Sequence, residues 1–437
     1  MTHFRGLLGV GAMMALAWLL SSDRRRFPLK TVVGGLVLQV AMGALVLKTE
    51  TGRAFFDWLG EIVVVVLKGA DAGAKFVFGP LAGDDPAVQW KAVAGIKIMS
   101  TIIAVATLSS IGYHYNILQR VVRGMAWVFS RVMGLTGPES LSGAANVFLG
   151  QTESPLLIRP YLGKLSESEM MAVMVGGFAT ISAGVMAYYV SLLGVGPDGV
   201  ATPERLAVAA RHLLTASLMS APASFVFAKI MIPAPRESRK WHAETADESE
   251  FAPIETKNGL DAAAIGAAEG MKLAINVMAM LIAFIALVWV VDAGLVRLGK
   301  WSLMAPLVAR MGLTELTLDG LLGLAFSPVA FLNGVDGRDC RLVGGLLGKA
   351  MATNEMIAYG SLSDLIRQGA MSQRSVVISI YSLCGFANLS SIGIQIGGIG
   401  SLAPERRGDL VRLGPRAMVA GALASWMTGC FAGMLIE

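Results

Sequence analysis

Long apolar stretches recur along the whole chain and are separated by short polar segments. Crossing the hydrocarbon of a bilayer takes about 20 residues of helix, and stretches of this kind predict eight spans, near 4–21, 31–48, 88–112, 170–194, 207–232, 270–296, 375–398 and 416–435. The apolar pieces 138–165 and 320–365 are too Gly-rich or too polar to cross simply, and they predict re-entrant hairpins. The stretches 53–80 and 115–133 mix aromatic and charged residues and predict helices at the membrane interface.

A polar motif occurs once in each half of the chain. Gly150–Glu153 and Thr353–Glu355 lie in the predicted hairpins, and each is followed by a span that small polar residues break, near Thr180 and Asn388. A carboxylate or an unwound backbone is costly in hydrocarbon, so such features occur where they line a protein cavity. Three intervening crossings place the two hairpins on opposite faces. This inverted repeat is typical of transporters whose substrate binds near the membrane midplane.

Composition and charge agree with a polytopic membrane protein. Hydrophobic residues make up 54% of the chain and charged residues 15%, which is unusual for a soluble enzyme. If the N-terminus lies outside, the loops 22–30, 113–137, 233–269 and 399–415 lie in the cytoplasm, and each carries a basic cluster. Four arginines around the second hairpin are exceptions: Arg338, Arg341, Arg367 and Arg374. The basic residues follow topology, so nucleic acid is not an expected partner, and a bacterial inner membrane is the expected location.

Nothing in the sequence points to catalysis or to an organic cofactor. The cysteines Cys340, Cys384 and Cys430 are scattered in apolar sequence, which argues against disulfides and zinc. The polar points in the spans lack a histidine or a close pair of acids, so we expect no enzyme. An ion channel or a structural membrane protein is the remaining rival, because polar breaks could also line a pore.

Four motifs together resemble the concentrative nucleoside transporter family, and they occur in the family's order: Asn146–Pro160, Gly176–Ile181, Thr353–Glu355 and Cys384–Gly393. Similarity extends over about 85–435. The resemblance implies a homotrimer in which each protomer has a fixed scaffold domain and a mobile transport domain. It also implies elevator-type import of nucleosides, driven by a cation gradient.

The resemblance to this family divides the chain into five parts. They are an N-terminal part of the scaffold (1–137), a first repeat (138–234), a cytoplasmic connector (235–269), a scaffold span with an outer loop (270–319) and a second repeat (320–437).

The resemblance assigns ribose binding to Glu355, Asn388 and Ser391, and base contacts to Gln151, Thr152 and Glu153. The chemistry agrees, because a carboxylate and an amide can bracket vicinal hydroxyls, whereas Gln and Thr can match the mixed donors and acceptors of a base. Phe386 would form an apolar wall beside the nucleoside, although ordinary helix packing explains that residue equally well.

Sodium coordination in the family uses an asparagine, a hydroxyl residue and backbone oxygens. The matching positions here are Asn146, Leu149, Thr180 and Ile181. Ligation by oxygen alone suits a hard cation such as Na⁺. The alternative is that Asn146 merely caps the hairpin tip and that protons drive transport through a carboxylate.

Base selectivity is the point at which the chain departs from the family. Gly150-Gln151 resembles broadly selective members, whereas Gly184 replaces a serine that is common in animal members. Uridine is the expected substrate, and the choice between purines and pyrimidines stays open.

Overall fold

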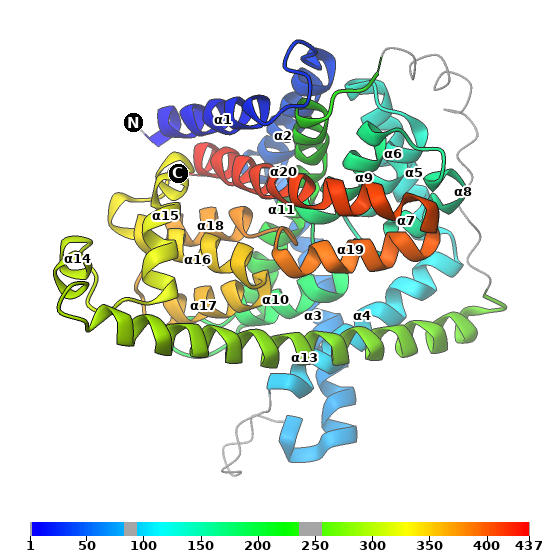
Figure 1. The fold of residues 1–437 in the computed structure, drawn as a ribbon. Coiled ribbons are helices and arrows are strands. Elements are labelled where there is room, and N and C mark those ends of the chain that lie inside the picture. Colours follow the sequence, from blue (N-terminus) through cyan, green and yellow to red (C-terminus); the bar gives the residue numbers. More distant parts are fainter. Residues whose placement is uncertain (1, 83–93, 236–255, 437) are drawn as a thin grey trace.

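The computed structural model describes residues 2–82, 94–235 and 256–436 (Figure 1). Over these ranges the chain is helical, apart from turns and one isolated β-bridge between Val195 and Ala201. The all-α prediction is therefore confirmed. The start of the predicted span 88–112 lies outside the described residues, as does most of the predicted connector, with Arg236, Arg239 and Lys240.

The N-terminal part consists of helices joined by short turns: α1 (Thr2–Leu19), α2 (Leu29–Lys48), α3 (Glu50–Phe78), the 3-10 helix η1 (Gly79–Ala82), α4 (Ala94–His114) and α5 (Ile117–Met133). The interfacial prediction 115–133 coincides with α5, whose buried residues Val122, Ala126 and Phe129 recur at helical spacing. The stretch 53–80 forms most of α3, an unbroken amphipathic helix.

Two sets of helices follow in the same order, each with a hairpin, a broken helix and a long helix. The first set is α6 (Gly137–Ala145), α7 (Ser154–Leu157), α8 (Arg159–Leu162), α9 (Glu167–Ala179), α10 (Ala183–Leu193) and α11 (Pro203–Met231). The second is α16 (Cys340–Ala352), α17 (Glu355–Arg367), α18 (Gln373–Ser382), α19 (Leu389–Leu402), η3 (Pro404–Arg406) and α20 (Arg407–Leu435). Between the sets lie α13 (Gly259–Gly299), α14 (Ala305–Arg310), α15 (Leu318–Leu332) and η2 (Gly337–Asp339).

Within the described ranges, six helical stretches are long and apolar enough to cross a membrane: Leu29–Lys48, Gly95–His114, Glu167–Leu193, Pro203–Met231, Gly259–Gly299 and Pro404–Leu435. They correspond to six of the eight predicted spans. The predicted span 4–21 forms α1, which belongs to the shorter apolar helices. The predicted span 375–398 forms the two half-helices α18 and α19, and the break falls at the polar motif.

Two predicted boundaries are corrected by the structure. α13 begins at Gly259, inside the predicted connector 235–269, because the Asn258 side chain caps it by accepting a hydrogen bond from the Asp261 N–H. An Ala-rich turn of high helix propensity follows that cap, although its hydropathy is too low to mark a span. The predicted hairpin 320–365 divides, because α15 is a separate helix that ends at the Gly334 turn, where φ is +86°.

The helices pack into a large core and a small one. α9, α11 and α20 are largely buried inside the chain, and α1 and α2 pack against α11 and α20. By contrast, α13 runs along one side of the molecule with most of its surface exposed, and it packs mainly against α4 (Figure 1). Their contact has its own small core of Ile98, Ile102 and Ala274. α4 and α13 thus form a closely packed pair, and α4 joins this pair to α3 and α10.

Candidate functional site

The tip of the first hairpin rests on the break between α9 and α10. α6 ends at Ala145, Asn146 is its C-cap, and α7 starts at Ser154, so the residues between the two helices form the tip. The Ala183 N–H donates to the Phe148 carbonyl at 3.0 Å, which joins the tip to the first turn of α10. The breaks in these two elements therefore face each other, and their unwound backbone groups gather at one place.

Asn146 lies in this place with an unsatisfied side chain. It is fully buried, and neither its amide oxygen nor its amide nitrogen has a hydrogen-bond partner among the described residues. An unsatisfied buried polar group costs about 1–3 kcal/mol, so such a group needs an explanation. A ligand that binds the amide oxygen would supply one.

Among the other predicted sodium ligands, Thr180 is linked to Asn146 through Gly176. The Asn146 amide is in tight contact with Gly176, where an added Cβ would come within 2.9 Å of its nitrogen. The Thr180 hydroxyl donates to the Gly176 carbonyl at 2.9 Å, so Thr180 lies one turn farther along the same helix. Leu149 and Ile181 are buried on the two segments that the bond between Phe148 and Ala183 joins. These oxygens fit the chemistry of a hard monovalent cation.

The second hairpin places Glu355 in a buried network. Asn354 caps α17 by accepting from the Ile357 N–H at 3.0 Å, so Glu355 occupies the first turn of that helix. One oxygen of Glu355 accepts from the Asn388 amide at 2.8 Å, and the other accepts from the Tyr189 hydroxyl at 2.9 Å. Two of the predicted ribose ligands are therefore in direct contact.

Asn388 also shapes the break between α18 and α19. Its side-chain oxygen accepts from the Ser391 N–H at 2.8 Å and from the Ser390 hydroxyl at 2.7 Å, which caps α19. Its amide group is thereby left to donate to Glu355. Phe386 precedes the cap, is buried, and accepts the Asn388 N–H on its carbonyl at 2.9 Å.

Gln151 connects the first hairpin to α19. Its amide nitrogen lies 3.2 Å from the Ser391 hydroxyl, and its oxygen accepts from the Gln395 amide at 3.1 Å. The predicted base residue Gln151 and the predicted ribose residue Ser391 are thus neighbours. Thr152 adjoins the same helix, where an added Cβ at Gly398 would come within 2.5 Å of its methyl group.

Glu153 stands apart from this network. Its side chain is exposed, and its carboxylate accepts from the Gly150 N–H at 3.2 Å, across its own turn. The structure therefore brings together Gln151, Glu355, Asn388 and Ser391, with Thr152 and Phe386 at the edge, whereas the Glu153 side chain forms no hydrogen bond with any of these described residues.

Tyr189 and Gln395 belong to this cluster but were not predicted from the sequence. Tyr189 is fully buried on α10, and its ring stacks on Tyr359 with 4.3 Å between centroids. A tyrosine in an apolar helix resembles ordinary core, although Tyr189 lies one turn after Val185, next to the family's selectivity position. Gln395 lies on the same face of α19 as Asn388 and Ser391, at spacings of seven and four residues, which was a usable signal.

Each hairpin is bonded to the broken helix of the other repeat. The first hairpin reaches α19 through Gln151, and the second reaches α10 through Glu355. A further bond runs from the Ser363 hydroxyl of α17 to the Leu192 carbonyl of α10 at 2.8 Å. Half-helix ends from both repeats thus meet around one polar cluster, as expected for a substrate site between two repeats.

Comparison with known proteins identifies the family. The model of the Na⁺-dependent nucleoside transporter C-terminus matches residues 212–433, that of the N-terminus matches 8–81, and a nucleoside recognition (Gate) model matches 95–196. The chain belongs to the concentrative nucleoside transporter family. It is therefore a transporter with a multi-pass membrane fold, and it has no catalytic function.

Similar proteins occur in bacteria and animals. The uncharacterized transporter YutK of Bacillus subtilis is 38% identical, over 99% of each chain. Mouse solute carrier family 28 member 3 is 36% identical over 100% of this chain and 59% of its own length. CNTnw, solved in an inward-facing substrate-bound state, is 33% identical with a TM-score of 0.85, covering 100% of this chain and 98% of that chain. Outward-facing variants of CNTnw match with TM-scores of 0.84 and 0.86.

Proposed function

We propose that this chain imports nucleosides together with Na⁺ by elevator-type alternating access. The observation that carries the proposal is the pairing of Glu355 and Asn388 where the two repeats meet. Glu355 and Asn388 would bracket the ribose hydroxyls with help from Ser391, while Gln151 and Thr152 contact the base and Phe386 forms an apolar wall. Uridine is the substrate that we expect. Glu153 would join this site after a movement of the hairpin tip, since its side chain is exposed here.

Na⁺ is proposed to bind at Asn146, Leu149, Thr180 and Ile181. The unpartnered buried amide of Asn146 supports this assignment, because a simple cap would leave fewer of its polar atoms unsatisfied. Bound Na⁺ would supply a positive charge that holds the hairpin tip against the end of α9. Since the tip also carries Gln151, Na⁺ and nucleoside should strengthen each other's binding reciprocally.

The rest of the proposed arrangement follows the family. The fixed scaffold would include α4 and α13, whose separate small core supports this choice. The N-terminal helices α1 and α2 pack on α11 and α20, which belong to the two repeats. The assignment of α1 and α2 to the scaffold therefore remains a prediction from the family. A homotrimer in a bacterial inner membrane, with the N-terminus outside, completes the proposal.

Uptake by proteoliposomes tests the function. Purified protein should accumulate radiolabelled uridine with saturation when Na⁺ is high outside, and replacing Na⁺ by choline should abolish the accumulation at two pH values. Accumulation that ignores Na⁺ but follows a proton gradient would establish the proton-coupled alternative. Flux that neither saturates nor accumulates would indicate a channel.

Glu355→Gln tests the ribose assignment. The variant keeps the shape of the side chain but loses the negative charge. Its two protein donors and the ribose hydroxyls would then lose charged hydrogen bonds, at a cost of roughly 1.5–3 kcal/mol each. We expect uptake to be abolished in protein that elutes and melts like the parent. Parental uptake would refute the assignment.

A further inference from the structure

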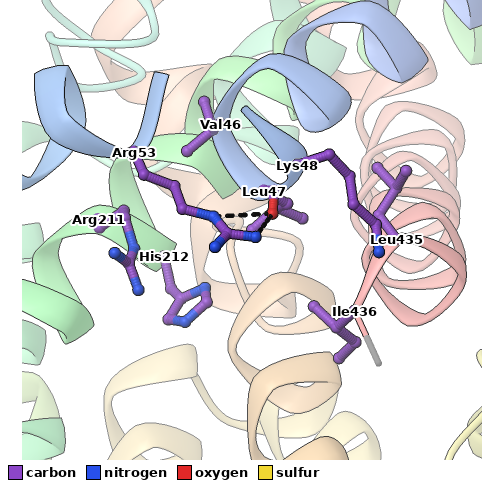
Figure 2. A pocket seen from close by; sticks show the side chains of 8 residues that line it. All are labelled: Val46, Leu47, Lys48, Arg53, Arg211, His212, Leu435 and Ile436. Atoms are coloured by element: carbon purple, nitrogen blue, oxygen red, sulfur yellow. Dashed lines mark hydrogen bonds between the residues drawn. The ribbon is translucent and has the colours of Figure 1, made fainter. Parts of the chain in front are cut away.

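A basic pocket lies away from the nucleoside site, where the membrane helices α2 and α20 end. Its cavity has a volume of about 440 Å³, and Lys48, Arg53, Arg211 and His212 form its polar wall (Figure 2). Lys48 is the last residue of α2, and Arg53 lies in the first turns of α3. Leu435, the last residue of α20, completes the opposite wall together with Ile436.

Positive charge in this pocket exceeds negative charge among the described residues. Arg53 and Arg211 carry permanent positive charge on its wall, and Asp57 pairs with Arg211 at 2.7 Å. Nη1 of Arg211 donates to both carboxylate oxygens of Asp57, which leaves the remaining N–H groups of that guanidinium without a protein acceptor in the described ranges. The pocket therefore has donors to offer to an anion.

Arg53 is held in place for such a role. Its Nε donates to the Leu47 carbonyl at 3.0 Å, and one terminal nitrogen donates to the same oxygen, as Figure 2 shows. This carbonyl belongs to the last turn of α2 and would otherwise lack a partner. The second terminal nitrogen of Arg53 has no acceptor in the described part of the chain, so a fixed guanidinium faces the cavity with free N–H groups.

The other wall of the pocket is apolar. Val46, Leu47, Leu435 and Ile436 line it, and they come from the ends of α2 and α20. α2, α11 and α20 all belong to the stretches that can cross a membrane, and the pocket lies at the ends of α2 and α20. In a bilayer that these helices cross, the cavity would lie at the depth where the headgroups meet the acyl chains.

We propose that this pocket binds the phosphate group of an anionic phospholipid. Arg53 and Arg211 would hold the phosphate through charge-assisted hydrogen bonds, which suit the planar fork of an arginine. The apolar wall would receive the upper part of an acyl chain. A bound lipid would then link α2 and α3 to α11 and α20.

Native mass spectrometry of delipidated protein in detergent tests this proposal. Phosphatidylglycerol and phosphatidylcholine with identical acyl chains are titrated separately, and inorganic phosphate is added in a third series. We expect phosphatidylglycerol to bind about tenfold more tightly than phosphatidylcholine, equivalent to one favourable charged contact. Phosphatidylglycerol should also raise the melting temperature of the protein.

Two variants and one control locate the effect. Arg53→Gln removes one donor, and the double variant Arg211→Gln with Asp57→Asn removes the other without leaving an unpaired acid. Each should abolish the preference for phosphatidylglycerol. Arg205→Gln is the matched control, because Arg205 lies on the same helix but pairs with Asp198 outside the pocket.

Three results would overturn the proposal. The first is equal affinity of the parent protein for both lipids. The second is a preference that survives in both pocket variants. The third is inorganic phosphate that displaces phosphatidylglycerol at equal concentration, which would assign the pocket to a free anion.

Discussion

Both carboxylate oxygens of Glu355 accept hydrogen bonds from neutral donors, Tyr189 and Asn388. A ribose hydroxyl must therefore share or replace one of these partners. Asn388 is tied to the start of α19 through its other atom, so it can move little. The Tyr189 ring is held by Tyr359, whose own hydroxyl donates to the Ile380 carbonyl at 2.9 Å. This chain of contacts fixes the orientation of the carboxylate before the substrate arrives.

Tyr189→Phe should therefore weaken uptake without abolishing it. The loss of one hydrogen bond to a charged group, about 1.5–3 kcal/mol, should raise KM for uridine by roughly tenfold or more, with a smaller change in kcat. Discrimination between uridine and 2′,3′-dideoxyuridine should fall as well, because the released carboxylate no longer favours vicinal hydroxyls.

Tyr359→Phe is the control for this effect. It removes a buried hydrogen bond of the same stack but leaves both partners of Glu355 in place. The melting temperature compares the stability of the two variants, and competition uptake compares their discrimination between uridine and 2′,3′-dideoxyuridine. If the two variants lose discrimination equally, Tyr189 has a structural role alone.

Some residues of the polar cluster could be predicted from the sequence, and others could not. Glu355 and Asn388 were predictable, because polar residues in apolar spans are costly and the motif recurs. Tyr189 was not, because a tyrosine can satisfy its hydroxyl in a core by many routes. Its partner lies 166 residues away, and this pairing depends on how the repeats pack.

The tip of the first hairpin and the break after α9 act together as one element. They carry Asn146 and Thr180, which we assign to Na⁺. Asn146→Ala and Thr180→Val should each raise the Na⁺ concentration for half-maximal uptake, while KM for uridine at saturating Na⁺ changes less. Uptake measured over a range of Na⁺ concentrations provides the test. An unchanged Na⁺ dependence in both variants would exclude these side chains as ligands.

Each hairpin is also anchored at its base by a carboxylate. Glu139 of α6 forms a buried ion pair with Lys229 of α11 at 2.5 Å. In the second repeat Asp339 accepts from the Ser372 N–H at 3.0 Å. Burial acts to raise the pKa of Asp339, but hydrogen bonds from Ser372 and Ser375 outweigh it and hold that pKa below its usual value.

The buried pair between Glu139 and Lys229 gives a stability prediction. Lys229→Met should destabilise the protein by about 3–5 kcal/mol, because it leaves a buried carboxylate without its partner. The double variant Lys229→Met with Glu139→Gln should recover much of the loss, since neither charge remains. Thermal unfolding in detergent compares the two. If the double variant is as unstable as the single one, the pair does not act through charge.

The packing of whole helices was less accessible to sequence than their existence. Hydropathy located most spans, because burial in lipid and burial in protein both require apolar residues. For the same reason it could not separate α11, which is buried in the chain, from α13, which is largely exposed. Nor could it show that α1 and α2 pack on α11 and α20, since those contacts join distant parts of the sequence.

Alternating access requires one group of helices to slide past another, and the pair α4 and α13 marks the boundary that we propose. Tyr188 of α10 packs against the small core of Ile98, Ile102 and Ala274 and so touches this boundary from the transport side. A link between α4 and α10 should therefore stop movement. A link inside the pair should not, because α4 and α13 would stay together.

Cysteine pairs test this division in a background that lacks Cys340, Cys384 and Cys430. The double variant Ile98→Cys/Tyr188→Cys is treated with a short, reducible bifunctional thiol reagent. This treatment should arrest uridine uptake, and reduction of the link should restore it. The same reagent on the double variant Ile102→Cys/Ala274→Cys should leave uptake near that of the untreated variant, because both positions belong to the proposed scaffold. If linking the second pair also arrests uptake, α4 or α13 belongs to the mobile part of the protein. Continued uptake by the first pair, with linkage verified by mass spectrometry, would show that the α4–α10 contact does not slide during transport.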